Sequence, residues 1–431
     1  MSHFLCFDNI FLGGFMKKSL KKVISLFCLF MLAIVSISLN ACSIKKDVKN
    51  EIKSESVVNT SESIVDSKEK VLSVLKVPVM EEVVYKGVYI KKTIDEFNAL
   101  GFEYGDSLNI TFSNGYVLND IPYYSGYYAK PGESLLVAYP SYKYIDACIC
   151  YGESMWEQAH LKDGDTADIV LNEKAKYKNL QKFFNVQYTN NRDDYSSDEV
   201  FANFRCVEMG NLKHKNLYRG ATPINNEYGR AKYVNDLIKE ANIKYVVDLT
   251  DTEELLNKYF REEDFASNYF KELYENGKVS VTHMTANYKT KEFAKLVVKA
   301  LTDMSKNEGP YYIHCVEGKD RTGFVIAVIE GLAGASYEDI VKDYMVTYEN
   351  YYGITEMKDK EKYDAYVKNR IDDILQYIAD IDTSGGTVGL ALNEIDWVNV
   401  MGRYLIDNGM SMEDMDNFYK NLMRDSFSDP D

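Results

Sequence analysis

The sequence predicts an α/β fold, in which a domain with a parallel sheet and a helical C-terminal extension follows a small β-rich domain. Two observations predict this arrangement. Between residues 71 and 188, segments rich in β-branched and aromatic residues are separated by turn-forming groups such as Ser113-Asn-Gly115. From residue 189 onward, short apolar segments alternate with amphipathic ones, as expected for a parallel sheet that carries helices on its faces.

The β-rich domain, residues 71–188, is predicted to be a small barrel or sandwich. One helical stretch near 93–100 interrupts its strands, and no segment of it carries a recognisable reaction. Cys148 and Cys150 would point to one face of a strand. Because no His or further Cys lies nearby in sequence, we expect both thiols to be buried packing rather than a zinc site. The predicted strands are 82–90, 107–112, 134–139 and 166–171.

The second domain, residues 189–431, is predicted to alternate strands with helices. Helix 322–332 is almost entirely apolar and is ended by Gly334. Ser336 caps the next helix, 337–348, and further helical segments extend to about residue 423. The other predicted elements are helices 226–241 and 290–304 and strands 243–249, 279–284 and 311–313.

Composition and charge exclude several classes of function. The chain has 431 residues, of which 50 are Lys or Arg and 66 are Asp or Glu, so its formal net charge is −16. A nucleic-acid-binding protein needs a broad cationic face, so we expect no nucleic-acid partner. Seven cysteines are too few for a disulfide scaffold of this length, and five histidines leave little for a multi-metal enzyme. We therefore expect neither a metal nor a cofactor.

Residues 1–41 are predicted to be a signal peptide. Four lysines precede an apolar run over 23–39, which is shorter than the roughly 20 residues that span a bilayer. The run ends in Leu39-Asn-Ala-Cys42, which resembles the lipobox of bacterial lipoproteins. The resemblance implies that Cys42 is acylated, becomes the mature N-terminus and anchors the chain to a membrane. The alternative is an uncleaved transmembrane anchor.

The polar segment 42–70 is predicted to be a flexible tether, because it has too few large apolar groups to offset its ordering entropy. Translation is predicted to begin at Met16, which opens a lysine-rich start. Removing residues 1–41 takes away four lysines and one acid, Asp8, and leaves 46 basic against 65 acidic residues, a net charge of −19. We expect the mature protein to be exported and lipid-anchored to the bacterial cell membrane, facing outside.

A strand-loop-helix junction holds the candidate active site. It reads His314-Cys-Val-Glu-Gly-Lys-Asp-Arg-Thr-Gly323, with five residues between Cys315 and Arg321. A strand that ends in a tight loop and opens a helix lets several backbone N–H groups converge on one point, where the helix N-terminus adds partial positive charge. These groups would favour the thiolate of Cys315 and make it a nucleophile at neutral pH. The junction therefore predicts hydrolysis of phosphate esters.

The other residues of the junction have predicted roles in this chemistry. The planar guanidinium of Arg321 can grip two phosphoryl oxygens, and Gly318 permits the backbone turn. We expect Thr322 to hydrogen-bond the sulfur and His314 to order the loop by hydrogen bonds. Lys319 either raises the positive potential and accepts a second phosphate or an acidic substrate, or points to solvent. The residues expected to contact the substrate are Val316, Glu317, Gly318, Lys319, Arg321 and Thr322.

The junction resembles the phosphate-binding loop of cysteine-dependent protein tyrosine phosphatases, and its Gly-Lys-Asp-Arg-Thr-Gly form is similar to the bacterial tyrosine and dual-specificity class. That class includes enzymes that also cleave phosphoinositides. Leu217-Tyr-Arg-Gly220 and Val247-Asp-Leu249 resemble two upstream blocks of the class, Leu-Tyr-Arg-Ser and Ile-Asp-Leu-Arg. The resemblance covers about 201–352 and implies a tyrosine-phosphatase-like fold. Two departures are Gly220, where serine is usual, and Thr250, where arginine is common.

Asp320 is predicted to be the general acid, because the departing oxygen needs a proton. Most tyrosine phosphatases supply an aspartate from a separate loop before the cysteine, and the corresponding stretch here, 281–288, contains no carboxylate. Asp320 lies inside the loop, and the resembling bacterial subgroup uses its loop aspartate in this way. Alternatively, Asp320 only pairs with Arg321 or caps the helix, and Asp251, after the second strand, is the acid.

The sequence thus predicts a phosphomonoester hydrolase that works through a cysteinyl-phosphate at Cys315. The leading substrate class is phosphotyrosine in proteins, with phosphoserine and phosphothreonine as further substrates. One alternative is a phosphatase of phosphoinositides or other multiply phosphorylated small molecules, which Lys319 favours. A second alternative is a surface binding module with a vestigial phosphatase domain, although Cys315, Gly318, Arg321 and Thr322 are all intact. The Gly318 and Thr322 pattern fits arsenate reductases and rhodanese-like enzymes less well.

Overall fold

The computed structural model describes residues 71–424, with gaps at 84–85 and 141, and these residues belong to one compact unit of the chain, Glu69–Asp431. No helix within these ranges is both long enough and apolar enough to cross a bilayer. The domain boundary between residues 188 and 189 stays a prediction. The predictions that fall outside the described residues are the signal peptide (1–41), the start at Met16, the lipidated Cys42 and the tether (42–70).

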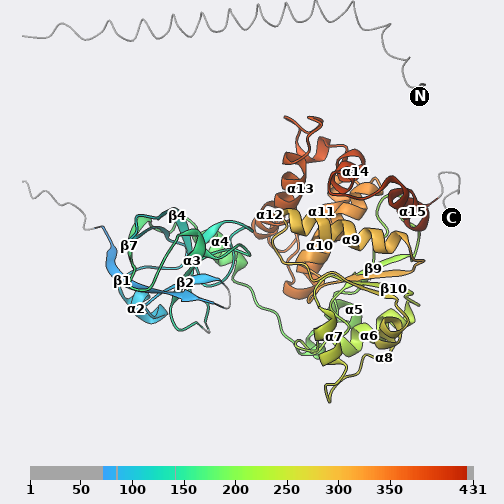
Figure 1. Cartoon of the computed structure of the whole chain (residues 1–431), viewed down its shortest axis with the longest axis horizontal. Helices are drawn as coiled ribbons and strands as arrows, with labels where there is room; N and C mark the ends of the chain where they lie inside the picture. Colours follow the sequence, from blue (N-terminus) through green and yellow to red (C-terminus); the bar gives the residue numbers. More distant parts are fainter. Residues whose placement is uncertain (1–70, 84–85, 141, 425–431) are drawn as a thin grey trace, which may run out of the picture. The chain divides into compact units, whose positions relative to one another are not determined.

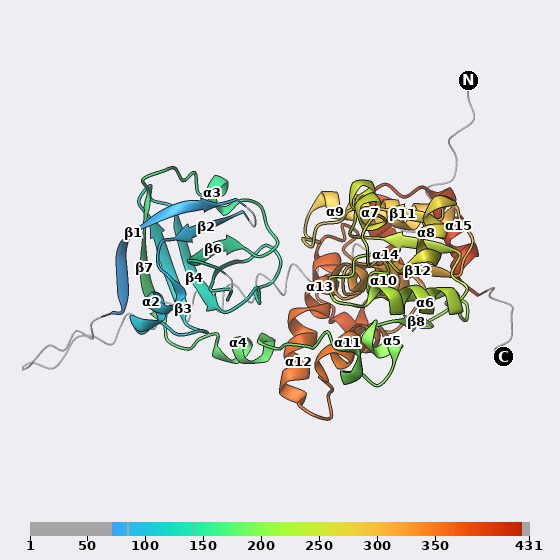
Figure 2. The same cartoon turned by 90° about the horizontal axis from the view of Figure 1, so that it is seen from below.

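Seven strands in the first part of the described chain form a closed barrel (Figure 2). Their order around the barrel is β1-β2-β6-β5-β4-β3-β7, and every neighbouring pair is antiparallel except β4 and β5. Closure pairs the edge strands with each other and so removes exposed sheet edges. The strands are β1 (Ser73–Glu82), β2 (Gly87–Ile90), β3 (Ser107–Phe112), β4 (Val117–Tyr124), β5 (Ser134–Val137), β6 (Ile145–Ile149) and β7 (Thr166–Glu173).

The interior of the barrel is filled by every second residue of its strands. Leu108, Ile110 and Phe112 of β3 are buried, as are Ala167 and Ile169 of β7. Successive side chains of a strand point to opposite faces, so this spacing puts one apolar row inside. Three short helices accompany the strands, α2 (Ile94–Ala99), α3 (Met155–Gln158) and, after β7, α4 (Lys178–Phe184).

The β-rich prediction is confirmed as a barrel, but the predicted strands omit β4, β6 and most of β1, and one of them is wrong. The predicted strand 82–90 is two antiparallel strands, because β1 ends at Glu82 and β2 begins at Gly87. Lys86 lies between them with a φ of 61°, a left-handed conformation outside the β region, so the extended chain is interrupted there. Cys148 and Cys150 are both buried, as expected for packing residues, and Cys150 donates to the carbonyl of Ala129.

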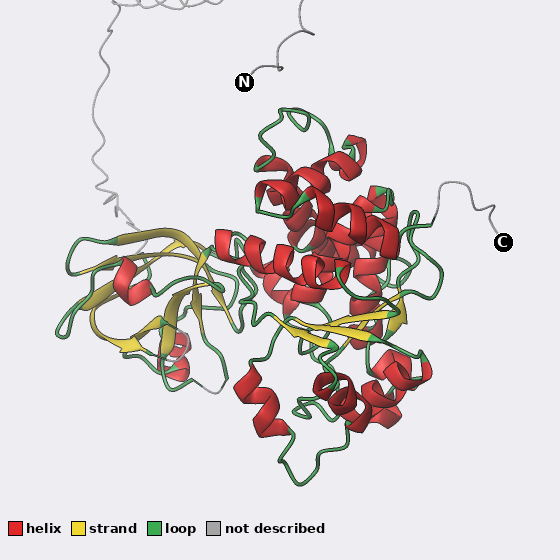
Figure 3. Cartoon of the chain, turned by 45° about the vertical axis from the view of Figure 1, so that its right-hand side comes forward, coloured by secondary structure: helices red, strands yellow, loops and turns green. Residues whose placement is uncertain are grey.

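A five-stranded sheet with the order β11-β10-β12-β9-β8 organises the second part of the described chain (Figure 3). The first four strands in this order pair in parallel, and β8 is an antiparallel strand at the edge. The central strand β12 lies between β10 and β9, so its carboxyl end is flanked by the ends of two other parallel strands. The strands are β8 (Arg205–Cys206), β9 (Leu217–Gly220), β10 (Tyr245–Asp248), β11 (Val279–Val281) and β12 (Tyr311–His314).

Helices cover both faces of this sheet, with α9, α10 and α14 on one face and α6 and α8 on the other (Figure 1). Alternate residues of the strands pack into the two hydrophobic cores, one on each face of the sheet. Val247 and Ile313 belong to the cluster that contains α9 and α10, whereas Val246 and Tyr312 belong to the cluster that contains α6 and α8. Burial on both faces explains the nearly continuous apolar strands of the sequence.

Most predicted elements of this domain are confirmed, with shorter ends at two of them. The predicted helix 226–241 begins only at Ala231, because Gly229 has a φ of 68°. The predicted strand 279–284 stops at Val281, and His283 adopts a φ of 49°. The capping box of Ser336 is present. The helices are α5 (Asp198–Phe201), α6 (Ala231–Glu240), α7 (Glu253–Tyr259), α8 (Asn268–Glu275), α9 (Lys291–Ser305), α10 (Asp320–Leu332), α11 (Tyr337–Tyr352), α12 (Lys360–Asn369), α13 (Ile371–Asp380), α14 (Trp397–Asp407) and α15 (Met412–Leu422), with 3-10 turns at Arg192–Asp194 and Leu392–Glu394.

Candidate active site

The catalytic loop, defined here as residues 315–319, joins the carboxyl end of β12 to the amino end of α10. His314, the last residue of β12, is in register with Asp248 on one side and Gly220 on the other. The two upstream blocks, Leu217–Gly220 and Val247–Leu249, therefore end next to the start of the loop. Ligands of parallel sheets bind at the carboxyl ends of the strands, so the loop lies where a substrate is expected.

Glycine is required at two facing positions where the loop meets β9. Gly318 has a φ of 66°, and a Cβ atom built on it would lie 2.2 Å from the carbonyl oxygen of Gly220. A Cβ atom on Gly220 would in turn lie 2.6 Å from the hydroxyl of Tyr312. The departure from serine at residue 220 thus has a steric reason, because Tyr312 fills the space that a side chain would need.

The carbonyl groups of the loop are held away from its centre by the surrounding scaffold. The N–H of Thr222 donates to the Val316 carbonyl at 3.1 Å, and the hydroxyl of Tyr351 donates to the Glu317 carbonyl at 2.8 Å. By contrast, the N–H groups of residues 316–321 have no acceptor among the described residues. A loop that turns its carbonyls outward and leaves its N–H groups unpaired is a ready site for an anion.

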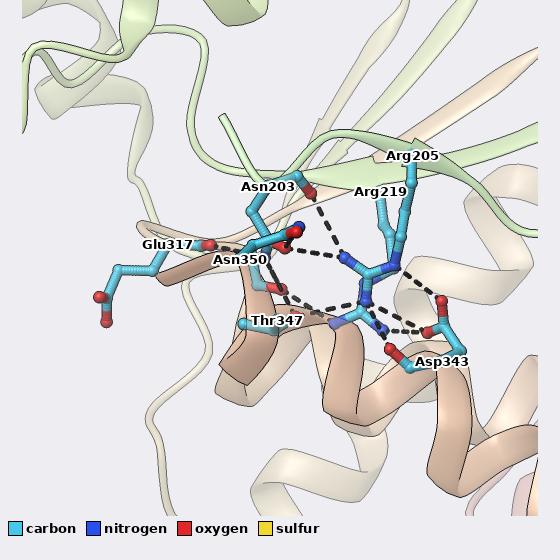
Figure 4. Close-up of polar contacts among 8 residues, drawn as sticks. Asn203, Arg205, Arg219, Glu317, Asp343, Thr347 and Asn350 are labelled. Atoms are coloured by element: carbon cyan, nitrogen blue, oxygen red, sulfur yellow. Dashed lines mark hydrogen bonds and ion pairs between the residues drawn. The ribbon is translucent and has the colours of Figure 1, made fainter. Parts of the chain in front are cut away.

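Asn203 and Arg219 complete this hold on the loop (Figure 4). The side-chain amide of Asn203 donates to the carbonyls of Glu317 and Gly318, at 3.2 Å each. The guanidinium of Arg219 donates to the Gly318 carbonyl at 2.9 Å. Arg219 is the arginine of the Leu-Tyr-Arg-Gly block, so the structure gives that block the role of positioning the catalytic loop.

A buried ionic cluster orients Arg219 (Figure 4). Asp343 of α11 accepts from Arg219 at 2.5 Å and from Arg205 at 2.8 Å, and its side chain is only 5% exposed. Burial alone would raise the pKa of Asp343, but the two guanidinium groups lower it below its ordinary value. Arg205 also donates to the hydroxyl of Thr347, which links the cluster to the next turn of α11. No motif or periodicity in the sequence points to Asn203, Arg205 or Asp343.

Cys315 is the first residue of the loop, and Arg321 lies in the first turn of α10. Cys315 is a free thiol with 3% of its surface exposed. One terminal nitrogen of Arg321 donates to the carbonyl of Met284 at 3.1 Å, which fixes the side chain beside the loop. The hydroxyl of Thr322 is buried and has no hydrogen-bond partner among the described residues, so its predicted bond to the sulfur is not formed in this structure.

Lys319 and Asp320 are neighbours at the start of α10. The ammonium of Lys319 lies 3.0 Å from Glu317 and 3.8 Å from Asp320, and the lysine side chain is 17% exposed. Burial alone would lower the pKa of Lys319, but these two carboxylates raise it well above its ordinary value. The alternative that Lys319 points to solvent is therefore wrong. Asp320 makes no side-chain cap of α10, and its side chain is 43% exposed.

His314 is held by packing rather than by the hydrogen bonds that we predicted. Its ring is fully buried, stacks on Tyr312 at 5.6 Å and meets the edge of Phe270 at 6.2 Å. Neither ring nitrogen has a hydrogen-bond partner among residues 71–424, and the nearest carboxylate oxygen, of Asp248, is 4.0 Å away. Burial lowers the pKa of His314 to about 4, so the ring is neutral at physiological pH.

Asp251, the alternative acid, is buried beside the strand ends. Asp251 is only 2% exposed, and one of its carboxylate oxygens has no hydrogen-bond partner in the described part of the chain. Burial and the neighbouring Asp248 raise the pKa of Asp251 to about 7. Asp248 itself accepts from the N–H groups of Thr250 and Asp251 and shapes the turn after β10. Of the two candidate acids, Asp320 alone is accessible to a substrate.

A cavity of about 190 Å³ opens beside the loop, and Lys319, Asp320 and Arg321 lie on its wall. Tyrosines of α11 and α12 and the side chain of Arg370 form much of the remaining wall. These residues had no signal in the sequence, because tyrosine is abundant along the whole chain. The tyrosines of this part of the wall are Tyr344, Tyr348, Tyr352 and Tyr366.

The described residues contain no group of three or more His, Cys, Asp or Glu side chains arranged to hold a metal ion. A parallel sheet whose central strand runs into an anion-binding loop with a cysteine and an arginine is the architecture of a cysteine-dependent phosphatase. The sequence model of the tyrosine phosphatase family matches residues 200–424, and the chain belongs to that family.

Two solved structures are similar to part of this chain. One is the core catalytic domain of the PP-IP phosphatase SIW14 from S. cerevisiae in complex with citrate, with 19% identity, a TM-score of 0.24, and coverage of 43% of this chain and 99% of that one. The other is a structure of the Siw14 catalytic core, with 18% identity, a TM-score of 0.23, and coverage of 43% and 98%. No curated protein matches the chain.

Proposed function

We propose that the protein hydrolyses phosphotyrosine in proteins through a cysteinyl-phosphate intermediate. The observation that carries the proposal is the catalytic loop with the first residues of α10, where the N–H groups from 316 to 321 have no acceptor among the described residues. Such donors are fixed before the substrate arrives, so they stabilise the charge of the transition state without reorganising.

The reaction follows from the placement of these groups. The Cys315 thiolate attacks phosphorus, the bond to the ester oxygen breaks, and Asp320 gives that oxygen a proton. A water molecule then attacks the cysteinyl-phosphate, Asp320 takes its proton, and the bond between phosphorus and sulfur breaks to return the thiolate. Arg321 holds two phosphoryl oxygens in both steps. A hydrogen bond from Thr322 to the departing sulfur requires its hydroxyl to turn toward Cys315.

The cavity beside the loop supports an aromatic ester as the substrate. Its wall is rich in tyrosine, and a ring packs favourably against aromatic side chains. An apolar cavity of roughly 150 Å³ holds a benzene ring, so a volume of about 190 Å³ is sufficient for a tyrosine ring. Phosphoserine and phosphothreonine would leave this aromatic wall uncovered and are proposed as poorer substrates.

Phosphoinositides and other multiply phosphorylated small molecules remain the second candidate, because Lys319 adds positive charge beside the loop. The ammonium of Lys319 is, however, already engaged by Glu317.

Turnover of matched peptides that carry phosphotyrosine, phosphoserine or phosphothreonine, with soluble inositol polyphosphates as the fourth substrate, tests the proposal. The assay is run in EDTA. We expect hydrolysis of the phosphotyrosine peptide to be fastest and to be insensitive to the chelator. Faster release of phosphate from the inositol compounds, or activity that needs a divalent metal, would contradict the proposal.

Asp320→Asn is expected to slow the hydrolysis of phosphotyrosine peptides by about 10²-fold or more, because the departing phenolate then leaves without a proton. An activated aryl phosphate, such as a nitrophenyl ester, has a good leaving group and should be slowed much less. The measurement is kcat for both substrates with each enzyme. Equal slowing of both substrates would assign the acid to another residue, and Asp251→Asn is the comparison variant.

We also propose that the protein is exported and anchored to the bacterial membrane through an acylated Cys42. The support is the resemblance of residues 39–42 to a lipobox. Fractionation of cells that express the full chain tests this proposal, since Cys42→Ala should move the protein out of the membrane fraction. Retention of that variant in the membrane would favour an uncleaved anchor instead.

A further inference from the structure

Arg370 lies at the junction of α12 and α13 on the wall of the cavity beside the catalytic loop. The central carbon of its guanidinium is 4.7 Å from the centre of the Phe184 ring. Among the residues that the structure describes, its side chain has no hydrogen-bond partner, and no carboxylate lies within 4.0 Å of it. Arg370 is thus a cation at a cavity wall whose side chain has no hydrogen-bonded or ion-paired partner among the described residues, and the charge of Asp320 acts on it only from beyond 4.0 Å.

The other cations of this wall are accounted for. Lys319 is paired with Glu317 at 3.0 Å, and Arg321 is assigned to the scissile phosphate. Arg370 stays charged, because Tyr348 and Asp320 raise its pKa although burial alone would lower it. Charges withdrawn from water are costly unless they are paired. An unpaired guanidinium at the edge of a substrate cavity is therefore expected to bind an anion that the substrate supplies.

We propose that Arg370 is a specificity-determining residue, which binds an acidic side chain next to the phosphotyrosine of the substrate protein. This inference rests on the proposed function. The phosphate enters the catalytic loop, the tyrosine ring packs against Tyr344 and Tyr348 of α11, and the flanking carboxylate pairs with Arg370. The planar guanidinium can donate two parallel hydrogen bonds to the two oxygens of a carboxylate. The contact is therefore specific in geometry as well as favourable in charge.

The composition of the wall favours a peptide over an inositol polyphosphate. A ring that carries several phosphates needs several unpaired cations around it. Apart from Arg321, the only lining cation without a carboxylate partner in the described ranges is Arg370. The tyrosine hydroxyls and rings that surround it suit an aromatic ester with one further anionic group.

Two phosphotyrosine peptides that differ only in Glu or Gln beside the phosphotyrosine provide the test. We expect the full-length enzyme to prefer the Glu peptides by about tenfold or more in kcat/KM, because a hydrogen-bonded ion pair contributes that much when partly desolvated. Arg370→Gln should bring the ratio close to one. Because both rates come from the same preparation, partial misfolding of the variant lowers them together and leaves the ratio intact.

Lys368→Gln is the matched control, since it removes the same charge from the exposed face of α12 two residues away. It should keep the preference for Glu. The inference is overturned if the wild-type enzyme shows no preference, if Arg370→Gln retains it, or if Lys368→Gln loses it to the same extent. A stronger preference for inositol polyphosphates that Arg370→Gln abolishes would also overturn it.

Binding of the same peptides to the Cys315→Ser variant separates this inference from the proposed function. Fluorescence polarisation gives the ratio of dissociation constants for the Glu and Gln peptides, with and without Arg370→Gln. A preference that depends on Arg370, together with no turnover by the wild-type enzyme, would support the anion site and contradict the proposed hydrolysis. If neither peptide binds, the anion site is contradicted as well.

Discussion

Cys315→Ser is expected to abolish turnover, lowering kcat by about 10⁴-fold or more, while phosphate still binds. The serine hydroxyl is a far weaker nucleophile than a thiolate, so the cysteinyl-phosphate cannot be replaced by a seryl-phosphate at a useful rate. The N–H groups of residues 316–321 and the guanidinium of Arg321 are unchanged by the substitution. The measurements are kcat with a chromogenic aryl phosphate and the dissociation constant of inorganic phosphate.

Cys206→Ser is the matched control, because Cys206 is also a free thiol, on β8, and among the described residues its side chain makes no hydrogen bond to the catalytic loop. This variant should keep its activity. Turnover by Cys315→Ser within tenfold of the wild type would remove cysteine from the mechanism. Loss of phosphate binding in a folded Cys315→Ser protein would show that the thiol, and not the loop amides, holds the anion.

Asp343→Asn is expected to lower the free energy of unfolding by about 3–5 kcal/mol, because it leaves two buried guanidinium groups without their shared carboxylate. Arg219 is 1% exposed and bonds Asp343 at 2.5 Å, so it has no access to water as a substitute. The same change should reduce kcat, since Arg219 positions the Gly318 carbonyl. Urea unfolding followed by circular dichroism gives the first quantity, and a chromogenic assay gives the second.

Asp236→Asn provides the comparison for this substitution. Asp236 pairs with Lys232 one helical turn away on α6, and both side chains are more than half exposed. Exposed pairs of this kind contribute little, so the unfolding midpoint should hardly move. If Asp343→Asn, like Asp236→Asn, changes neither the free energy of unfolding nor kcat, the buried cluster does not position the catalytic loop. A stable Asp343→Asn protein with reduced kcat would limit the role of the cluster to positioning.

The structure confirms the predicted elements whose conformation depends mainly on residues that are close together in the chain. Helix α10 follows from an unbroken apolar run, and the strands β10 and β12 follow from short apolar segments between turns. The loop between β12 and α10 keeps Cys315 and Arg321 near each other because only five residues separate them in the chain. Errors came at left-handed residues such as Lys86 and His283, whose conformation the apolar pattern does not reveal.

The sequence by itself determined the class of fold, and it predicted Cys315 as the nucleophile and Arg321 as the phosphate-binding residue, since each depends on residue type and local spacing. The tertiary structure alone decided how the loop is held and what lies beside it. Arg205 and Asp343 are 138 residues apart in the chain, and Arg219 reaches Gly318 across 99 residues. The cavity that contains Arg370 likewise forms only when α11 and α12 pack beside the loop. Such contacts depend on the packing of distant segments, and no periodicity of the chain encodes them.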